Sequence, residues 1–334
     1  MNRKVTLLYI SLACVLSMQA QTRQQMGGVY YAYPEGPSAK TGTFGKATYV
    51  LSDSLNVPQG FAPFYISHYG RHGSRWMPKD DRYVWICKHF EDESNLTPLG
   101  LQVKGMLQRV WENARGNGGK LSKLGALQHQ GIAHRMFERY PQIFAAGNAV
   151  KARSSVVDRC AKSMLAFTSE LHTLQPGLNL DVKTDSADMA WIAYASPEVK
   201  ALENRTHVQA QVSPRRFLLQ LFKDVSKVDE PLKLMTEMHT VASSIQDVGL
   251  NFSSYPQDIE DGLNALFTDD EFRAIYEANN LRMAINNGTV ATNEDIPARS
   301  AISLWQNIEA EADRALRSVK SSATLRFGHD TALY

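Results

Sequence analysis

The stretch Phe64–Trp76, "FYISHYGRHGSRW", joins a run of apolar residues to a glycine-containing turn that carries fixed positive charge. Its first half combines aromatic and β-branched residues and is closed by Gly70, which is typical of a buried β-strand. Its second half sets His72 between two arginines, whose charges oppose protonation of the imidazole ring. We therefore predict a strand that delivers a neutral histidine to a pocket suited to an anion.

Two later segments repeat the arrangement of a strand followed by charge. Residues 148–155, "NAVKARSS", predict a strand with Arg153 near its end, and residues 321–328 predict another, followed by His329 and Asp330. The carboxyl ends of parallel strands line one crevice in α/β sheets, where ligands bind. We therefore expect three segments that lie far apart in the chain to meet in one pocket.

Between these strands the sequence is mostly helical. Thr97 and Pro98 open a helix that runs to about residue 116, a second is expected over 124–139, and a third begins at Ser154 or Ser155. Residues 213–320 are almost wholly helical in pattern, with a capping box at 268–271 and a long last helix. A helical block placed before a final strand predicts an inserted domain.

The fold class that follows is α/β, a three-layer sandwich around a mostly parallel sheet, with an inserted all-helical domain. The expected division of the 334 residues is a signal peptide at 1–20, an α/β core at 21–195 and 321–334, and a helical insertion at 196–320. The chain stops soon after Asp330, and we expect that the C-terminal part of the core is missing from it.

The first twenty residues predict export. Arg3 and Lys4 precede an apolar run that ends near Ala20, which is the order of a secretory signal. Lipidation at Cys14 is the alternative, disfavoured because Ser11 stands where an aliphatic residue is expected. We therefore expect a secreted or periplasmic protein with no membrane span after cleavage of the signal.

Charge and cysteine content exclude several partners. Removal of residues 1–20 takes away two of the 36 basic residues and none of the 34 acidic ones, which leaves the mature chain without net charge. Nothing then favours nucleic acid or a membrane surface, so anion binding must come from local clusters. Cys87 and Cys160 form no disulfide framework, and both a single pairing and two free thiols stay open. The oligomeric state stays open too.

Four motifs, in this order along the chain, carry a specific resemblance: "RHGSR" at 71–75, "LTPLG" at 96–100, "RSSVVDRCAKS" at 153–163 and "GHDTAL" at 328–333. Together they resemble the histidine phosphatase superfamily, in the branch of histidine acid phosphatases, phytases and multiple inositol polyphosphate phosphatases. The last motif departs from the inositol polyphosphate phosphatases, which usually have His-Ala-Glu where this chain has His-Asp-Thr.

The resemblance implies a role for each matching residue. His72 would attack phosphorus and form a phosphohistidine, and Asp330 would protonate the leaving oxygen. The phosphoryl oxygens would be held by Arg71, Arg75, Arg153 and His329. Guanidinium groups match phosphate oxygens and neutralise their charge, so no cofactor or metal is expected.

Several other residues have plainer interpretations. Arg159 and Ser163, one helical turn apart, predict a structural hydrogen-bond pair. Metal binding by His68 and His72 is disfavoured because Gly70 and Gly73 break the helix that such spacing requires. Ordinary solvated charge is the first interpretation of three further basic residues, which are also candidate contacts for extra phosphates, namely Lys79, Arg82 and Arg205.

The predicted activity is that of a secreted phosphomonoester hydrolase acting on phytate or other inositol polyphosphates, which are small-molecule substrates. One alternative is a broad-specificity acid phosphatase on sugar phosphates, and another is a catalytically dead phosphate-binding relative. Because Asp330 must be protonated for its first task, an acidic optimum is expected.

Overall fold

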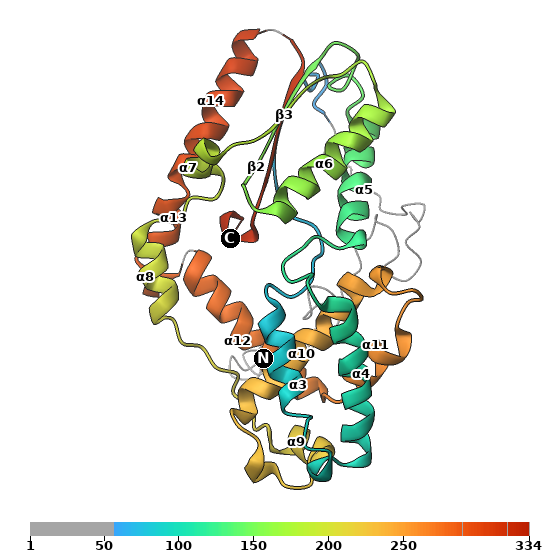
Figure 1. The fold of residues 1–334 in the computed structure, drawn as a ribbon. Helices are drawn as coiled ribbons and strands as arrows, with labels where there is room; N and C mark the ends of the chain where they lie inside the picture. The colour runs from blue at the N-terminus through green and yellow to red at the C-terminus, as the bar shows by residue number, and fades with distance from the viewer. Residues whose placement is uncertain (1–56, 289, 319, 334) are drawn as a thin grey trace, which may run out of the picture.

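The computed structural model describes residues 57–288, 290–318 and 320–333. The expected signal peptide, the alternative lipidation site at Cys14 and most of the glycine- and proline-rich segment that follows lie outside the described residues. Figure 1 shows a parallel sheet with its covering helices in the upper part and a group of helices in the lower part. The last described residues lie between the two parts.

Four parallel strands form one sheet in the order β1-β4-β2-β3. Three of them, β1 (Tyr65–Arg71), β2 (Ala149–Ser154) and β4 (Ser322–Gly328), lie where the sequence predicts strands. The edge strand β3 (Asn179–Thr184) was not predicted. Because β4 pairs with both β1 and β2, the last strand of the chain holds the sheet together from its centre.

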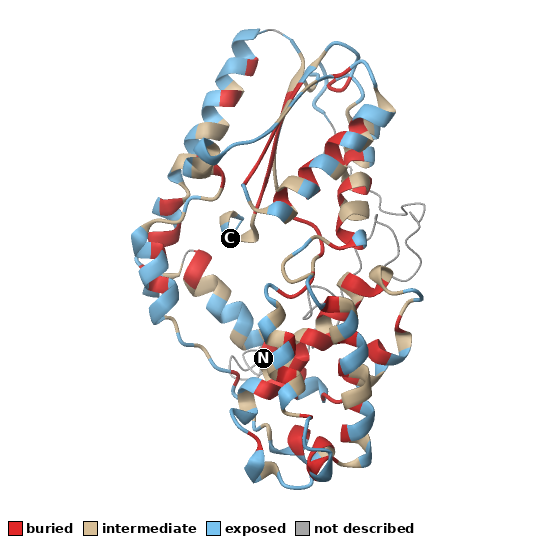
Figure 2. Ribbon diagram, viewed as in Figure 1, coloured by how far each residue is buried: buried red, intermediate tan, exposed pale blue. Residues whose placement is uncertain are grey.

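Helices cover both faces of this sheet. On one face lie α5 (Lys123–Arg139) and α6 (Asp158–Leu174), and on the other lie α7 (Met189–Ile192) and α14 (Ile302–Ser318). Figure 2 shows β2 and β4 largely buried between these layers, whereas β3 at the edge is largely exposed. The apolar side chains of α5, α6 and the strands form one cluster, which includes Phe144, Val150, Phe167, Leu171, Leu325 and Phe327. The three-layer α/β fold predicted from the sequence is confirmed.

The remaining helices are shorter or belong to the lower part of the molecule. Their bounds are α3 (Asp80–Lys88), α4 (Pro98–Ala114), α8 (Pro197–Arg205), α9 (Arg215–Leu221), α10 (Pro231–Val248), α11 (Gln257–Asn264), α12 (Asp269–Asn287) and α13 (Ile296–Ser300). The final short turn, η7, spans Asp330–Ala332.

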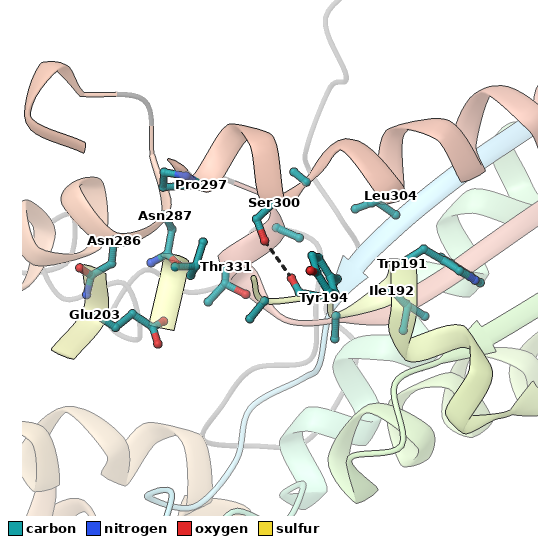
Figure 3. A pocket seen from close by; sticks show the side chains of 15 residues that line it. Trp191, Ile192, Tyr194, Glu203, Asn286, Asn287, Pro297, Ser300, Leu304 and Thr331 are labelled. Atoms are coloured by element: carbon teal, nitrogen blue, oxygen red, sulfur yellow. Dashed lines mark hydrogen bonds between the residues drawn. The ribbon is translucent and has the colours of Figure 1, made fainter. Parts of the chain in front are cut away.

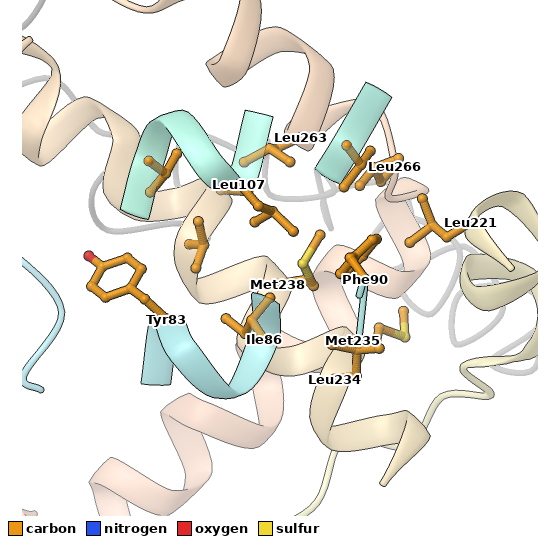
Figure 4. Close-up of a cluster of buried hydrophobic side chains, with 14 of the residues drawn as sticks. Tyr83, Ile86, Phe90, Leu107, Leu221, Leu234, Met235, Met238, Leu263 and Leu266 are labelled. Atoms are coloured by element: carbon orange, nitrogen blue, oxygen red, sulfur yellow. The ribbon is translucent and has the colours of Figure 1, made fainter. Parts of the chain in front are cut away.

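A second hydrophobic cluster fills the lower part of the molecule (Figure 4). It joins α3 and α4 to α9, α10 and α11, through side chains that include Tyr83, Ile86, Phe90, Leu107, Leu221, Met238 and Leu263. Residues 76–114, expected in the α/β core, therefore pack with residues 210–275. The boundary expected at residue 196 does not separate the two clusters, because α3 and α4 turn their apolar faces toward the helical block rather than toward the sheet.

The ends of the helices show which local signals the sequence carries. Thr97 accepts a hydrogen bond from the Gly100 amide, and Thr268 and Glu271 form the predicted capping box. The predicted start of α6 at Ser154 or Ser155 was wrong, since β2 continues through Ser154 and the helix begins at Asp158. Cys87 and Cys160 are free thiols. Within the described part of the chain, every helix is too short or too polar to cross a bilayer.

Candidate active site

The carboxyl ends of β1, β4 and β2 lie side by side. Arg71 is paired in register with Gly328, and Ser154 with Phe327. Just beyond the strand ends, the His72 amide donates to the Gly328 carbonyl over 3.1 Å and the Ser155 amide to the Phe327 carbonyl over 3.0 Å. The segments after the three strands are thus tied to one another by their backbones, and their side chains surround one space.

His72 is almost completely enclosed there, with 4% of its surface exposed. Its Nδ1 lies 2.8 Å from the Gly73 carbonyl oxygen, which can only accept, so Nδ1 carries the proton of the neutral ring. The lone pair then belongs to Nε2. Burial lowers the pKa of His72 to about 3 against the opposing bond to Gly73, and the charges of Arg71, Arg159 and Arg75 lower it further. The sequence argument named only the arginines, but burial is the larger cause.

Close backbone packing fixes the loop that carries His72. The Gly73 amide donates to Ser163 Oγ on α6 over 3.1 Å, and the Ser74 amide donates to Gln128 Oε1 on α5 over 2.9 Å. A Cβ atom on Gly73 would stand 2.4 Å from the Gly125 carbonyl oxygen, so only glycine allows this approach. Ser163 has a structural role, although its partner is Gly73 rather than Arg159.

Arg71 and Arg75 flank the histidine. Arg71 Nε lies 3.0 Å from Asp330 Oδ2, with both side chains partly exposed. Arg75 donates from Nη1 to the Trp76 carbonyl over 2.7 Å, while its buried Nε has no hydrogen-bond partner among the described residues. Burial, together with the charges of Arg71 and Arg159, lowers the pKa of Arg75 to about 10. The group therefore stays charged near neutral pH.

His329 faces His72 from the end of β4. The two rings lie 5.6 Å apart, edge to face, and His329 Nε2 lies 3.5 Å from Ser155 Oγ. Its amide donates to Tyr69 Oη over 3.2 Å. Gly328 permits this contact, because a Cβ there would stand 2.0 Å from the same oxygen. Burial lowers the pKa of His329, and the charge of Arg159 lowers it further, so both favour the neutral ring.

Arg153 does not join this group. Side chains alternate between the two faces of a strand, and residue 153 points to the face covered by α7 rather than to the strand end. Its Nη2 lies 2.6 Å from Asp181 Oδ2, its Nε 3.7 Å from Asp188 Oδ2, and its Nη1 donates to the Asp181 carbonyl. Two carboxylates thus hold Arg153. This arrangement gives it a structural role in place of the predicted phosphate-binding role.

Arg159 takes the place that was predicted for Arg153. It lies in the first turn of α6, whose positive end it extends toward the pocket. Its charge acts on His72, Arg75 and His329. Its buried Nε, like that of Arg75, has no hydrogen-bond partner in the described ranges. The sequence signal that would have found it is the position of Arg159 just past a strand, where Arg75 also lies.

The three candidate contacts for further phosphates differ in exposure and in the partners that they already have. Lys79 is exposed and lies just before α3. Its neighbour Pro78 is close to Arg159, since a Cβ atom on Gly119 would lie 3.0 Å from the Pro78 carbonyl oxygen and 3.8 Å from Arg159 Nη1. Arg82 is held by Glu237, with Nη2 2.7 Å from Oε2. Arg205 is exposed at the end of α8. Lys79 therefore has the best position of the three. No group of three metal-ligating side chains occurs in the part of the chain that the structure describes.

A separate hollow of about 70 Å³ lies beside η7, between α7, α8, α12 and α13 (Figure 3). It is lined by apolar side chains such as Ile192, Pro297 and Leu304, with Thr331 reaching in from η7 and Ser300 near the Tyr194 carbonyl. Its lining contains the carboxylate of Glu203 and lacks any lysine or arginine. The hollow is therefore unsuited to a phosphate group, although it adjoins Asp330.

Fold and site together define an α/β protein with a cluster of arginine and histidine side chains at the carboxyl ends of parallel strands. Solved structures with this fold include multiple inositol polyphosphate phosphatase from Bifidobacterium longum bound to inositol hexasulfate, at a TM-score of 0.63 and 15% identity, covering 90% of this chain and 77% of that one. The phytase from D. castellii matches at a TM-score of 0.61 and 13% identity, covering 95% and 68% of the two chains.

In sequence, the chain is similar to multiple inositol polyphosphate phosphatase 1 of Gallus gallus, with 23% identity over 209 residues. That match covers 61% of this chain and 45% of the relative, so the chain spans about half the length of the curated relative. No protein-family model matches. The likeness confirms the resemblance to the branch of acid phosphatases, phytases and multiple inositol polyphosphate phosphatases that the motifs indicated.

Proposed function

We propose that this protein is a phosphoric monoester hydrolase that acts on inositol polyphosphates through a phosphohistidine. The observation that carries the proposal is the state of His72, a buried neutral imidazole whose Nδ1 is bonded to a carbonyl, set among three guanidinium groups. Phosphoryl transfer depends on positioning and charge neutralisation. The pocket supplies both with groups of the chain itself.

In the first step, a phosphate group binds to Arg71, Arg75 and Arg159, whose planar guanidinium groups match its oxygens. His72 Nε2 attacks phosphorus with its lone pair, and the bond from phosphorus to the ester oxygen breaks. The Nδ1–H bond to Gly73 holds the ring in place while positive charge develops on it. His329 donates to a phosphoryl oxygen from the opposite side.

Asp330 supplies the proton that the leaving oxygen needs. Its carboxyl lies against Arg71 and 38% of the side chain is exposed, so it exchanges protons with solvent. After the alcohol leaves, the same carboxylate accepts a proton from a water that attacks the phosphohistidine. This second attack releases inorganic phosphate and restores His72, and the order of events follows general acid–base catalysis.

The substrate class is proposed from the relatives. The Bifidobacterium longum enzyme, whose fold this chain shares, has been solved with inositol hexasulfate and with phosphate. The curated sequence relative is named for the same activity on inositol polyphosphates. A substrate with several phosphate groups also suits the exposed Lys79 at the rim, which is free to meet a second anion.

The test is release of inorganic phosphate from p-nitrophenyl phosphate and from phytate at about pH 5. His72→Ala is expected to abolish release from both, while His134→Ala, a surface histidine paired with Glu170, leaves it unchanged. EDTA is expected to have no effect. Release that survives His72→Ala refutes the nucleophile, and loss in EDTA refutes the metal-free mechanism. Turnover of p-nitrophenyl phosphate without turnover of phytate would favour a broad acid phosphatase.

We also propose that the protein is exported and that residues 1–20 are removed, on the strength of the charged and apolar order at the start of the sequence. Mass spectrometry of the protein recovered from a periplasmic or culture fraction tests this. A mature chain that begins near residue 21 is expected, and an intact Met1 in the cytosolic fraction would contradict it.

A further inference from the structure

A carboxyl group from the lower part of the molecule reaches the loop that carries His72. Ser74 Oγ donates to Asp247 Oδ1 over 2.6 Å, and Asp247 lies near the end of α10. The amide of the same Ser74 is bonded to α5, and its carbonyl accepts from Ser122. The loop is therefore held by the sheet part through its backbone and by the helical part through one carboxylate.

The positive charges that act on Asp247 are the same ones that would act on a bound phosphate group. Arg71 and Arg75 both favour its ionised form, as does the bond from Ser74, yet burial outweighs them and raises the pKa of Asp247 to about 6. From the side of α11 it faces Tyr255, whose hydroxyl is bonded to Glu260. Asp261 of α11 acts on the same Tyr255, so two carboxylates of α11, Glu260 and Asp261, lie on this side of Asp247. Its ionisation thus depends on two arginines that the proposed substrate also needs.

We propose that Asp247 is a positioning residue of the anion pocket, which takes up a proton from solvent when a phosphate dianion enters and returns it when phosphate leaves. This inference rests on the proposed function only in placing the anion at Arg71 and Arg75. The step needs one proton from solvent and no other reactant, since that proton converts the carboxylate to the carboxylic acid. Asp247 then keeps its bond from Ser74 through Oδ1 in both states.

The reason is a competition for the same positive charge. An anion at Arg71 and Arg75 cancels the field that stabilises the Asp247 carboxylate and adds negative charge beside it. Two anionic groups in a partly buried site are unfavourable, so the carboxyl gives up its charge by protonation. By reciprocity, a protonated Asp247 strengthens anion binding and an ionised Asp247 weakens it.

Calorimetric titration with inorganic sulfate tests this without any turnover. Sulfate stays dianionic in the relevant pH range, so it takes up no proton itself. Titrations in buffers of different ionisation enthalpy give the number of protons bound with the anion. We expect the wild-type protein to take up more protons than Asp247→Asn between about pH 6 and about pH 8, by at most one, with no difference below about pH 5. His72 and His329 contribute equally to both proteins.

The affinities for sulfate give a second readout. The inference predicts tighter binding by Asp247→Asn, whereas a purely structural role predicts weaker binding. The asparagine side chain introduced by Asp247→Asn would accept the bond from Ser74 but carry no charge, so this variant mimics the protonated state. It is expected to bind sulfate more tightly than wild type at about pH 8, by up to tenfold for each pH unit above the Asp247 pKa, and equally at about pH 5. A structural role predicts weaker binding at every pH.

Two further variants complete the test. Ser74→Ala removes a bond that favours ionised Asp247, so the window of proton uptake is expected to move to higher pH. Asp258→Asn removes an exposed carboxyl on α11 that is paired with Arg109, and its uptake is expected to match wild type. If Asp247→Asn does not fold, the shift in Ser74→Ala decides the question, and an unmoved window overturns the inference.

The outcome that overturns the inference is specific. Sulfate that binds to the wild-type protein and to Asp247→Asn with the same proton uptake refutes it and leaves the proposed function standing. Wild-type protein that binds neither sulfate nor phosphate refutes the proposed function instead, and the inference falls with it. Weaker binding of sulfate to Asp247→Asn at every pH also overturns it.

Discussion

Arg153 and Arg159 are near neighbours in sequence with opposite surroundings. Arg153 lies inside β2, and the carboxylates of Asp181 and Asp188 hold its guanidinium group. Arg159 lies past the end of the strand, where its charge acts on His72. A guanidinium that two carboxylates already hold has little to offer a phosphate. In the proposed mechanism, Arg153 therefore contributes to stability and Arg159 to phosphate binding.

Arg159→Ala is expected to reduce phosphate release strongly and to leave stability nearly unchanged. Loss of one preorganised donor to the transition state lowers kcat by about 10²- to 10³-fold. Arg153→Ala is expected to keep kcat/KM within about threefold of wild type. It should lower the free energy of unfolding by about 1–3 kcal/mol, since it leaves Asp188 and a strand carbonyl without their donor. Steady-state kinetics and urea unfolding of both variants give the comparison.

The opposite pattern would contradict this assignment. If Arg153→Ala loses activity while its unfolding midpoint is unchanged, Arg153 holds phosphate as the sequence alone predicted. If Arg159→Ala retains full activity, the third guanidinium of the pocket must come from elsewhere.

At the scale of the element, the loop after β1 depends on contact between two backbones. Gly73 meets Gly125 at the start of α5, and a Cβ on either residue would overlap the backbone of the other segment. Backbone cannot move aside as a flexible side chain can. Any larger residue must therefore shift the loop that carries His72, or shift α5.

Gly73→Ala is expected to lower kcat by about 10²-fold, because small displacements of a catalytic group are costly. The matched control is Gly105→Ala, in the middle of α4, where an added Cβ meets no atom within 4 Å. That change should stabilise the protein by about 0.5–1 kcal/mol without affecting the rate, since alanine favours helix over glycine. Kinetics and thermal unfolding of the two variants decide; an unimpaired Gly73→Ala enzyme would show that the loop has room.

The sequence predicted those elements that are marked by a short, continuous pattern of residues. Apolar runs ended by glycine located β1 and β4, and Thr268 with Glu271 located the start of α12. Edge strand β3 was missed because only Leu180 and Val182 of it pack on the core, which leaves no apolar run. Arg153 was misplaced because the end of a strand cannot be read to the residue from sequence, and a shift of one residue reverses the face.

The meeting of β1, β2 and β4 at one edge was predicted from the general geometry of parallel sheets, but contacts that no such rule covers could not be predicted. The bond from Ser74 to Asp247 joins residues 173 positions apart and has no motif. The same holds for the cluster that unites α3 and α4 with the helical block, since an amphipathic helix shows that it has an apolar face but not what covers that face.

At the scale of the whole molecule, the shared cluster makes the two parts of the chain interdependent. A chain from which residues 196–320 have been deleted would keep α3 and α4 but lose α9, α10 and α11. It would expose Ile86, Phe90 and Leu107, which are at most 3% exposed in the intact protein. We expect this chain to aggregate or to unfold without a cooperative transition, as judged by size exclusion and urea unfolding. A soluble, cooperatively folded product would show that the α/β part is independent.

Three buried histidines around β1 make the stability of the whole molecule depend on pH. Burial is the first cause that lowers the pKa of His68 and His129 to about 4 and that of His72 to about 3. In the unfolded chain each returns to its ordinary value near 6.5. Between about pH 6.5 and about pH 4 the unfolded chain therefore binds more protons than the folded one, and the free energy of unfolding falls as pH falls.

Asp247 opposes this trend in part of the same window. Its pKa is about 6 in the folded protein and near 3.8 unfolded, so the folded state holds the extra proton between these values. These three histidines against one carboxyl leave an excess of about two protons, or about 3 kcal/mol lost for each pH unit, and the lowered pKa of His329 acts in the same direction. Urea unfolding from about pH 6.5 to about pH 4.5 measures this slope. His129→Gln should reduce the slope by one proton, about 1.4 kcal/mol per pH unit, whereas the exposed His134→Gln should not. Equal slopes in all three proteins would mean that His129 titrates normally when folded, and that the core beneath the pocket admits water.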